Sequence, residues 1–202
     1  MNKHEKDSIR KYNRIASSYD KSLEGRFTKK PKKKMLSLCG LPNGGKVLDV
    51  GCGNGSLINA ISQKSTVSAY GTDITPNMIE ECRKNYPQID FTVSSGEKLM
   101  YEDNFFDMIT ICYVLHHLNN PMKFFEEAQR TIKRGGSLIV GELWYPAPIR
   151  QFFDYIIFPL LKAGDNKVFT HKRLKSLFTE HGFVITEIYK KGFIQIVKGR
   201  KI

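Results

Sequence analysis

Two rhythms of apolar and polar positions alternate along the chain, and they indicate strands and helices in turn. Short and almost continuous apolar runs predict buried strands at residues 46–50, 67–74, 90–95, 106–115 and 137–143. Apolar side chains at helical spacing predict intervening helices at residues 56–63, 76–85 and 120–136. Because such strands alternate with helices, we expect a doubly wound α/β fold, with a mostly parallel sheet covered by helices on both faces.

The two ends of the chain depart from this alternation. Residues 183–199 contain two strand-like runs joined at Lys191 and Gly192, which predicts an antiparallel hairpin at the sheet edge. Residues 28–42 are typical of a short helix with Pro31 in its first turn and Gly40 at its end. With 202 residues, 41% of them apolar, the chain is long enough for one core, so we expect a single domain.

A glycine-rich loop follows the first predicted strand. Gly51, Gly53 and Gly55 are spaced by one residue each, where bare backbone can approach a ligand at the start of a helix. A dinucleotide site would need G-x-G-x-x-G, and Ser56 stands where its third glycine belongs. Asp73, at the end of the second strand, is suitably placed to accept hydrogen bonds from ribose hydroxyls. These features fit a ligand with a ribose, an ammonium group and a carboxylate.

Three segments in this order resemble the successive motifs of the class I S-adenosylmethionine-dependent methyltransferases: residues 47–55 (VLDVGCGNG), 71–79 (GTDITPNMI) and 104–118 (NFFDMITICYVLHHL). The match spans residues 46–143. It is similar to the small-molecule branch that includes quinone-biosynthesis and natural-product enzymes. The resemblance implies a Rossmann-like sheet of seven strands with an antiparallel last strand. It also implies S-adenosylmethionine as cofactor and S-adenosylhomocysteine as product.

The resemblance also implies roles for individual residues. Asp49 and the loop glycines would hold the methionine part, Asp73 the ribose, and Ile74 and Met78 the adenine. Ser95 stands where the family usually has an aspartate that meets the adenine amino group, and a hydroxyl is the weaker acceptor. The full set of expected cofactor contacts is Asp49, Gly51, Gly53, Asn54, Gly55, Asp73, Ile74, Met78, Ser95, Gly96, Glu97, Cys112, Tyr113, Tyr12 and Tyr19.

The expected reaction is an in-line displacement at the methyl carbon, helped mainly by alignment of the acceptor. It requires no metal, and a general base only if the acceptor is protonated. The candidates for that base are His116, His117 and Tyr19, with Glu142 as a further one. A purely structural role for either histidine remains open.

Within the single domain we expect four segments: an N-terminal helical lid (residues 1–44), a cofactor-binding core (45–143), a substrate-lid insertion (144–170), and a final helix with the edge hairpin (171–202). The insertion has an apolar stripe interrupted by Pro159, and we expect this stripe to pack on the core. The alternatives are a pocket for a hydrophobic acceptor, a dimer contact or a helix that touches lipid. The stripe consists of Ile149, Phe152, Phe153, Ile156, Ile157, Leu160 and Leu161.

The formal net charge is +12, and six residues, 29–34 (KKPKKK), hold five lysines. We interpret this run as a solvated face, although it could attract nucleic acid or an anionic membrane surface. A nucleic-acid methyltransferase is the rival enzyme, but the segment YVLHHL occupies the place of its N/D-P-P-aromatic or Pro-Cys motif. A regulator that binds the cofactor without turnover is the non-enzymatic alternative.

The four cysteines form no C-x-x-C pair, which favours small apolar fillers over a zinc site or disulfides. A charged start and the lack of a long apolar run predict a soluble, cytoplasmic protein without a signal peptide or transmembrane segment. We expect a monomer or homodimer acting on a small-molecule acceptor, with at most weak contact to a membrane surface.

Overall fold

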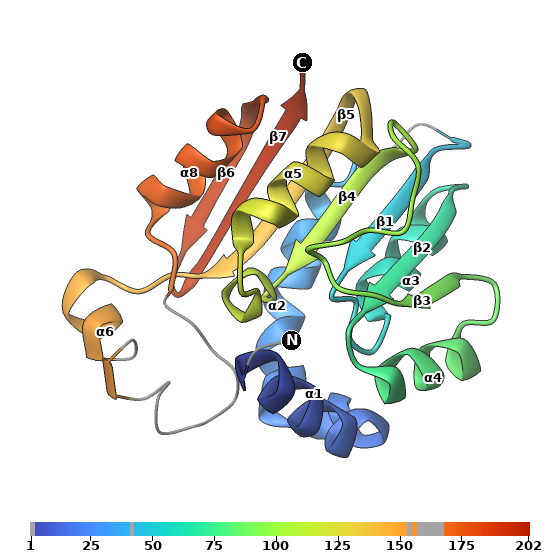
Figure 1. Ribbon diagram of the computed structural model, residues 1–202, viewed down its shortest axis with the longest axis horizontal. Coiled ribbons are helices and arrows are strands. Elements are labelled where there is room, and N and C mark those ends of the chain that lie inside the picture. The colour runs from blue at the N-terminus through green and yellow to red at the C-terminus, as the bar shows by residue number, and fades with distance from the viewer. Residues whose placement is uncertain (1–2, 41–42, 153–154, 157–167) are drawn as a thin grey trace.

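The computed structural model describes residues 3–40, 43–152, 155–156 and 168–202. A single sheet of seven strands runs through it in the order β3-β2-β1-β4-β5-β7-β6 (Figure 1). Strands β1 to β5 are parallel, and β7 lies antiparallel between β5 and β6, so the predicted fold class is confirmed. The strands are β1 (Lys46–Val50), β2 (Ser68–Asp73), β3 (Asp90–Val93), β4 (Phe106–Cys112), β5 (Ile132–Leu143), β6 (Phe183–Lys191) and β7 (Ile194–Lys201).

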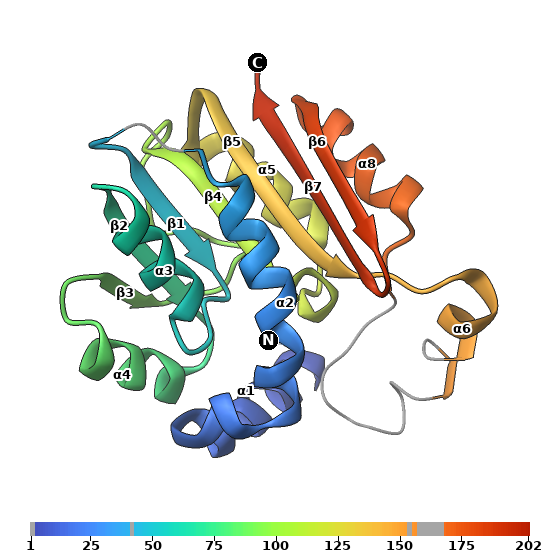
Figure 2. The same ribbon diagram turned by 180° about the vertical axis from the view of Figure 1, so that it is seen from behind.

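Helices cover both faces of this sheet. Helices α5 and α8 pack on the face seen in Figure 1, and α2, α3 and α4 lie on the face seen in Figure 2. Each layer encloses its own apolar cluster, which is why the central strands are apolar on both sides. The helices are α1 (Lys3–Ile15), η1 (Ala16–Lys21), α2 (Leu23–Leu38), α3 (Ser56–Lys64), α4 (Pro76–Asn85), η2 (Leu115–His117), α5 (Pro121–Thr131), α6 (Ala147–Phe152) and α8 (His171–Glu180).

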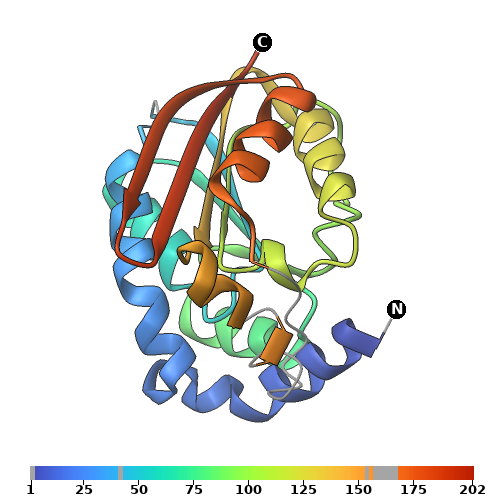
Figure 3. The same ribbon diagram turned by 90° about the vertical axis from the view of Figure 1, so that its left-hand side faces the viewer.

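The helix that was predicted at residues 28–42 has different bounds in the structure. Helix α2 begins at Leu23, not near residue 28, because the Ser22 hydroxyl caps it by accepting a hydrogen bond from the Gly25 amide at 3.1 Å. Pro31 therefore lies inside the helix instead of in its first turn. The early start carries the chain across the carboxyl ends of the central strands, together with α1 and η1 (Figure 3).

Two element boundaries were also predicted too far along the chain. Helix α5 ends at Thr131, because the fully buried Ile132 already pairs with Phe106 as the first residue of β5. Strand β4 ends at Cys112, because Tyr113 has a φ of 58° and turns the chain into η2. The C-terminal hairpin is present as predicted, but its turn consists of Gly192 and Phe193, because Lys191 still pairs with Ile194 as the last residue of β6.

The three described members of the apolar stripe in the insertion are exposed instead of packed on the core. Ile149, Phe152 and Ile156 are 39%, 50% and 47% exposed, so the expected burial of the apolar stripe is wrong for these three residues. The remaining members of the predicted stripe, Phe153, Ile157, Leu160 and Leu161, lie outside the described residues, as does Pro159.

Candidate active site

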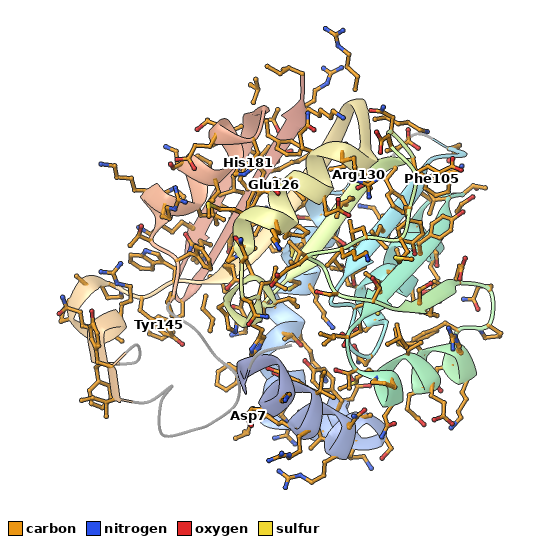
Figure 4. The ribbon with its side chains drawn as sticks, in the orientation of Figure 1. Asp7, Phe105, Glu126, Arg130, Tyr145 and His181 are labelled. Atoms are coloured by element: carbon orange, nitrogen blue, oxygen red, sulfur yellow. The ribbon has the colours of Figure 1, made fainter. Side chains whose placement is uncertain are left out.

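A cavity of about 380 Å³ lies at the carboxyl ends of the parallel strands, beneath α1, η1 and the start of α2. This volume is within the range of small-molecule sites, and the position is the one at which open α/β sheets bind their ligands. The chain leaving β5 also borders it, at Tyr145. Figure 4 labels Tyr145 and Asp7 of α1 at this lower end of the molecule and Arg130 at the opposite end. Thirteen predicted site residues line the cavity: Tyr12, Tyr19, Gly51, Gly53, Asp73, Ile74, Met78, Ser95, Gly96, Cys112, Tyr113, His116 and His117.

The glycine loop forms one wall of the cavity. Gly51, Gly53 and Gly55 all have positive φ angles, between 54° and 72°, a conformation that glycine adopts without steric cost. A Cβ on Gly51 would collide with the Val114 side chain, whereas one on Gly53 would meet nothing within 4 Å. Gly55 is the N-cap residue of α3 and lies outside the cavity lining. The space next to the Gly53 Cα is therefore open to a ligand, although the Gly53 carbonyl already accepts a hydrogen bond from Cys82 Sγ.

Asp73 joins this loop to the end of β2. Its Oδ2 accepts a hydrogen bond from the Gly53 amide and its Oδ1 accepts one from the Thr75 amide, both at 2.9 Å. Burial raises the pKa of Asp73, and these two hydrogen bonds oppose the rise. Each carboxylate oxygen keeps a second lone pair, so the side chain can accept further hydrogen bonds from the cavity.

Asp49 lies behind the loop and does not line the cavity. The side chain is 2% exposed, and its Oδ1 accepts a hydrogen bond from the Thr110 hydroxyl at 2.6 Å. Burial raises the pKa of Asp49 to about 6, against the lowering effects of that hydrogen bond and of the Lys32 charge. The carboxylate provides a negative potential beneath the glycine loop without direct exposure.

Lys32 is a cavity residue that the sequence analysis missed. Its ammonium group donates hydrogen bonds to Asn54 Oδ1 at 3.0 Å and to Ser56 Oγ at 2.9 Å. Asn54 itself donates to Asp20 Oδ1 at 2.6 Å, so it supports the lysine from outside the lining. A signal was available, because Lys32 is four residues from Thr28 and three from Met35, both buried on the inner face of α2. Lys29, Lys30 and Lys33 are exposed and fit the solvated face that was predicted, whereas Lys34 is half-buried, with its Nζ 4.8 Å from the centroid of the Tyr189 ring.

Two adjacent histidines of η2 line the cavity. His116 Nδ1 lies 2.7 Å from Oε2 of the fully buried Glu142, whose Oε1 accepts a hydrogen bond from the Leu115 amide at 2.8 Å. The rings of His116 and His117 have centroids 4.2 Å apart. His117 Nε2 lies 3.4 Å from the Tyr12 hydroxyl, with the two rings edge to face. Helix α1 is thereby connected to the end of β4.

Three further predicted residues are Ser95, Glu97 and Tyr19. Ser95 and Tyr19 line the cavity, whereas Glu97 does not. Ser95 lines the cavity, and its hydroxyl accepts a hydrogen bond from the Glu97 amide at 3.2 Å. Glu97 itself points elsewhere, since its Oε1 accepts from the amides of Asn119 and Asn120 at the start of α5. Burial raises the pKa of Tyr19 to about 12, so its phenol keeps its proton at neutral pH.

The roof of the cavity contains further residues that the sequence did not single out. Lys11 and Glu24 form an ion pair at 2.7 Å between α1 and α2, and both line the cavity. No periodic or motif signal marks them, because the pair depends on how two helices meet. The other unpredicted lining residues are Ser8, Phe27, Thr28, Val50, Cys52, Thr75, Ser94, Val114, Leu118, Leu143 and Tyr145.

The described residues lack two further kinds of feature. They include no group of three or more histidine, cysteine, aspartate or glutamate side chains that could hold a metal ion. None of the helices described is both long and apolar enough to cross a membrane.

Comparison with known proteins decides the family. A family model described as a methyltransferase domain matches residues 48–140. A ubiquinone/menaquinone biosynthesis C-methyltransferase from Hydrogenovibrio crunogenus is 33% identical over 199 residues, covering 84% of this chain and 78% of the relative. The chain belongs to the class I S-adenosylmethionine-dependent methyltransferases. Like other members, this methyltransferase takes its methyl group from S-adenosylmethionine and releases S-adenosylhomocysteine.

A further relative and a solved structure agree with this family and with its fold. A demethylmenaquinone methyltransferase from Tropheryma whipplei is 29% identical over 172 residues, covering 79% of this chain and 70% of the relative. Among solved structures, a chain in the complex between the Haloferax volcanii Trm112 methyltransferase activator and a methyltransferase superposes with a TM-score of 0.82. That match has 17% identity and covers 94% of this chain and 96% of the other, so it supports the methyltransferase fold.

Proposed function

We propose that this methyltransferase transfers the methyl group to a small hydrophobic acceptor bound beneath the N-terminal helices. The observation that carries the proposal is the apolar part of the cavity lining contributed from outside the glycine loop, at Phe27, Leu118, Leu143 and Tyr145. Such a surface favours an apolar ring or chain over a charged substrate. The names of the relatives agree, since those proteins act in ubiquinone or menaquinone biosynthesis.

The residues present fit S-adenosylmethionine, which supplies a methyl group activated by an adjoining sulfonium. We assign Asp73 to the ribose hydroxyls and the open backbone of Gly53 to the methionine part. The Lys32 ammonium is suited to the carboxylate of that part, and the buried charge of Asp49 to its ammonium group. The remaining contacts are assigned to Ile74, Met78, Ser95, Gly96, Cys112, Tyr113, Tyr12 and Tyr19. Asn54, Gly55 and Glu97 are assigned supporting positions outside the lining.

For an acceptor that carries a proton, His117 is our candidate for the general base. It lines the cavity, and its Nε2 is within reach of the Tyr12 hydroxyl, so the contact with α1 would orient the ring. His116 is assigned a positioning role, because Glu142 holds its Nδ1. Tyr19 is the weaker candidate, since a phenol with its pKa raised to about 12 is a poor base at neutral pH.

The test is methyl transfer from labelled S-adenosylmethionine into a cell extract that is then separated into small-molecule, lipid, protein and nucleic-acid pools. The Asp73→Ala protein serves as the control for cofactor-dependent labelling. Label in the small-molecule or lipid pool supports the proposal. Label confined to nucleic acid would overturn it in favour of the rival enzyme, and no label despite measured cofactor binding would favour a regulator.

The location and assembly of the protein are also proposals. We propose a cytoplasmic protein, and support comes from Cys39, Cys52, Cys82 and Cys112, which are all buried free thiols. We propose a monomer or homodimer in solution, which light scattering at several concentrations would decide.

A further inference from the structure

Most of the net positive charge of this protein belongs to the N-terminal segment, whose helices cover the cavity. Residues 1–38, from which α1, η1 and α2 are built, contain twelve lysines and arginines but only four aspartates and glutamates. This stretch therefore carries eight of the twelve net positive charges in less than a fifth of the chain. A field of one sign in one place attracts a polyanionic surface.

Much of this charge points outward. Arg26, Lys30 and Lys33 recur at helical spacing along α2, and all three are exposed. Helix α1 has a similar exposed stripe of Lys6, Arg10 and Arg14. Lys32 lies on the inner side of α2 and instead donates hydrogen bonds to Asn54 and Ser56 at the glycine loop.

Large apolar side chains are exposed among these charges. Leu23 and Phe27, one turn apart in the first part of α2, are 69% and 71% exposed, although Phe27 also borders the cavity. Helix α6 and residues 155–156 lie at the same end of the molecule in all three ribbon views (Figures 1, 2 and 3). They add the exposed residues Ile149, Phe152, Tyr155 and Ile156.

We propose that this end of the molecule docks on the surface of an anionic lipid bilayer. The basic side chains of α1 and α2 would contact lipid phosphates, while Leu23, Phe27 and the apolar side chains of α6 enter the headgroup region. Nucleic acid would satisfy the charges but leaves the apolar side chains in water, which is why lipid is favoured. The inference rests on the proposed function: an apolar acceptor dissolved in the bilayer would reach the cavity without crossing water.

The test is co-sedimentation of the full chain with phosphatidylcholine vesicles that contain or lack phosphatidylglycerol. We expect binding only with the anionic lipid, and a decline at high salt. Removing three charges together, in Arg26→Gln/Lys30→Gln/Lys33→Gln, should weaken it roughly 100-fold, at about five-fold per charge. Leu23→Ser/Phe27→Ser should also release the protein.

Matched variants control for general loss of charge or of apolar surface. Arg134→Gln/Lys172→Gln/Lys175→Gln removes three exposed charges from other elements, and Val184→Ser/Ile188→Ser changes two exposed apolar residues of β6. Both should bind vesicles as the unmodified protein does. Calorimetry with S-adenosylhomocysteine confirms that the α2 charge variant is folded.

The proposal is overturned if the α2 variants bind vesicles as well as their controls do. It is also overturned if a labelled RNA, not the vesicles, loses binding when the α2 charges are removed. Vesicle binding requires neither cofactor nor acceptor. Docking with no label in lipid or small molecules would therefore refute the proposed acceptor and leave the docking intact.

Discussion

Asp73 shapes the candidate site, and we propose that it also binds the ligand there. Two amide hydrogen bonds fix its carboxylate between the glycine loop and the start of α4, and lone pairs remain for a ligand. We expect Asp73→Ala to weaken binding of S-adenosylhomocysteine by about 1–3 kcal/mol, the range for hydrogen bonds to a charged group. Titration calorimetry measures this, with the exposed Asp90→Ala on the neighbouring strand as control. Equal affinities for the two variants would refute the ribose assignment.

We expect the buried Asp49 to make cofactor binding dependent on pH. Because burial raises its pKa to about 6, the carboxyl is neutral below that pH and cannot attract the ammonium group of the cofactor. Affinity should therefore rise with pH up to about 6 and level off above it. Calorimetry between pH 5 and 8, at roughly unit intervals, tests this. Asp49→Asn should bind more weakly and lose most of the dependence near pH 6; a variant with the same profile as the original would exclude Asp49 as its source.

The chemical role of His117 depends on the acceptor, since a general base is needed only if the acceptor carries a proton. If it removes a proton from the acceptor, His117→Gln should lower kcat by a factor of about 10² to 10⁴ and leave cofactor affinity unchanged. Tyr12→Phe should have a smaller effect, because it removes only the hydroxyl that contacts the ring. Steady-state kinetics with the acceptor identified in the labelling experiment provide the measurement. An unchanged kcat in His117→Gln would leave alignment as the main source of rate.

At the scale of elements, two glycines of the loop allow the energetic cost of backbone strain to be distinguished from that of a steric collision. Gly53→Ala should cost about 1–2 kcal/mol of unfolding free energy, because alanine is strained at positive φ but its Cβ meets nothing. Gly51→Ala has the same strain and adds a collision with Val114, so about 1–3 kcal/mol more is expected. Urea denaturation of the two variants compares them. Equal losses would mean that Val114 can move aside.

The sequence predicted elements and site residues correctly wherever the local pattern agreed with the contacts made in the folded protein. The order of strands and helices, the glycine loop and Asp73 were all predictable, because apolar runs, glycine spacing and a strand-end carboxylate are local signals. Where one element ended and the next began was less predictable. Ile132 continues the apolar pattern of α5, and only its pairing with Phe106 in β4 decides that it belongs to a strand.

The parts of the site that were missed depend on contacts between distant segments. Lys32 was indistinguishable from its neighbours in the lysine run until α2 was placed over the glycine loop. The ion pair of Lys11 with Glu24 and the contact of Tyr12 with His117 require α1 to be docked. Exposure of Ile149 and Phe152 opposed their sequence pattern, because an apolar face predicts burial but does not name what covers it.

At the scale of the whole molecule, the ligand should act as a clamp between the sheet and its N-terminal cover. With S-adenosylhomocysteine at about 100 times its Kd, binding adds about 2.7 kcal/mol to stability. For a domain of this size the melting temperature should then rise by roughly 5 to 11 °C. Differential scanning fluorimetry measures the shift, and Asp73→Ala should reduce it.

The same clamp should be visible by hydrogen exchange. Amides of α1, η1 and α2 should slow more than those of α8, which packs on the sheet away from the cavity lining. Uniform slowing across the chain would contradict a local cover.

Strand β7 follows β5 and β6 in the sequence but lies between them in the sheet. Residues 194–201 fill the gap between β5 and β6 and hydrogen-bond to both. During synthesis from the N-terminus, β6 has no neighbour in the sheet until these residues leave the ribosome. The central strands can associate earlier, but the nascent chain exposes two unpaired strand edges until its last strand arrives.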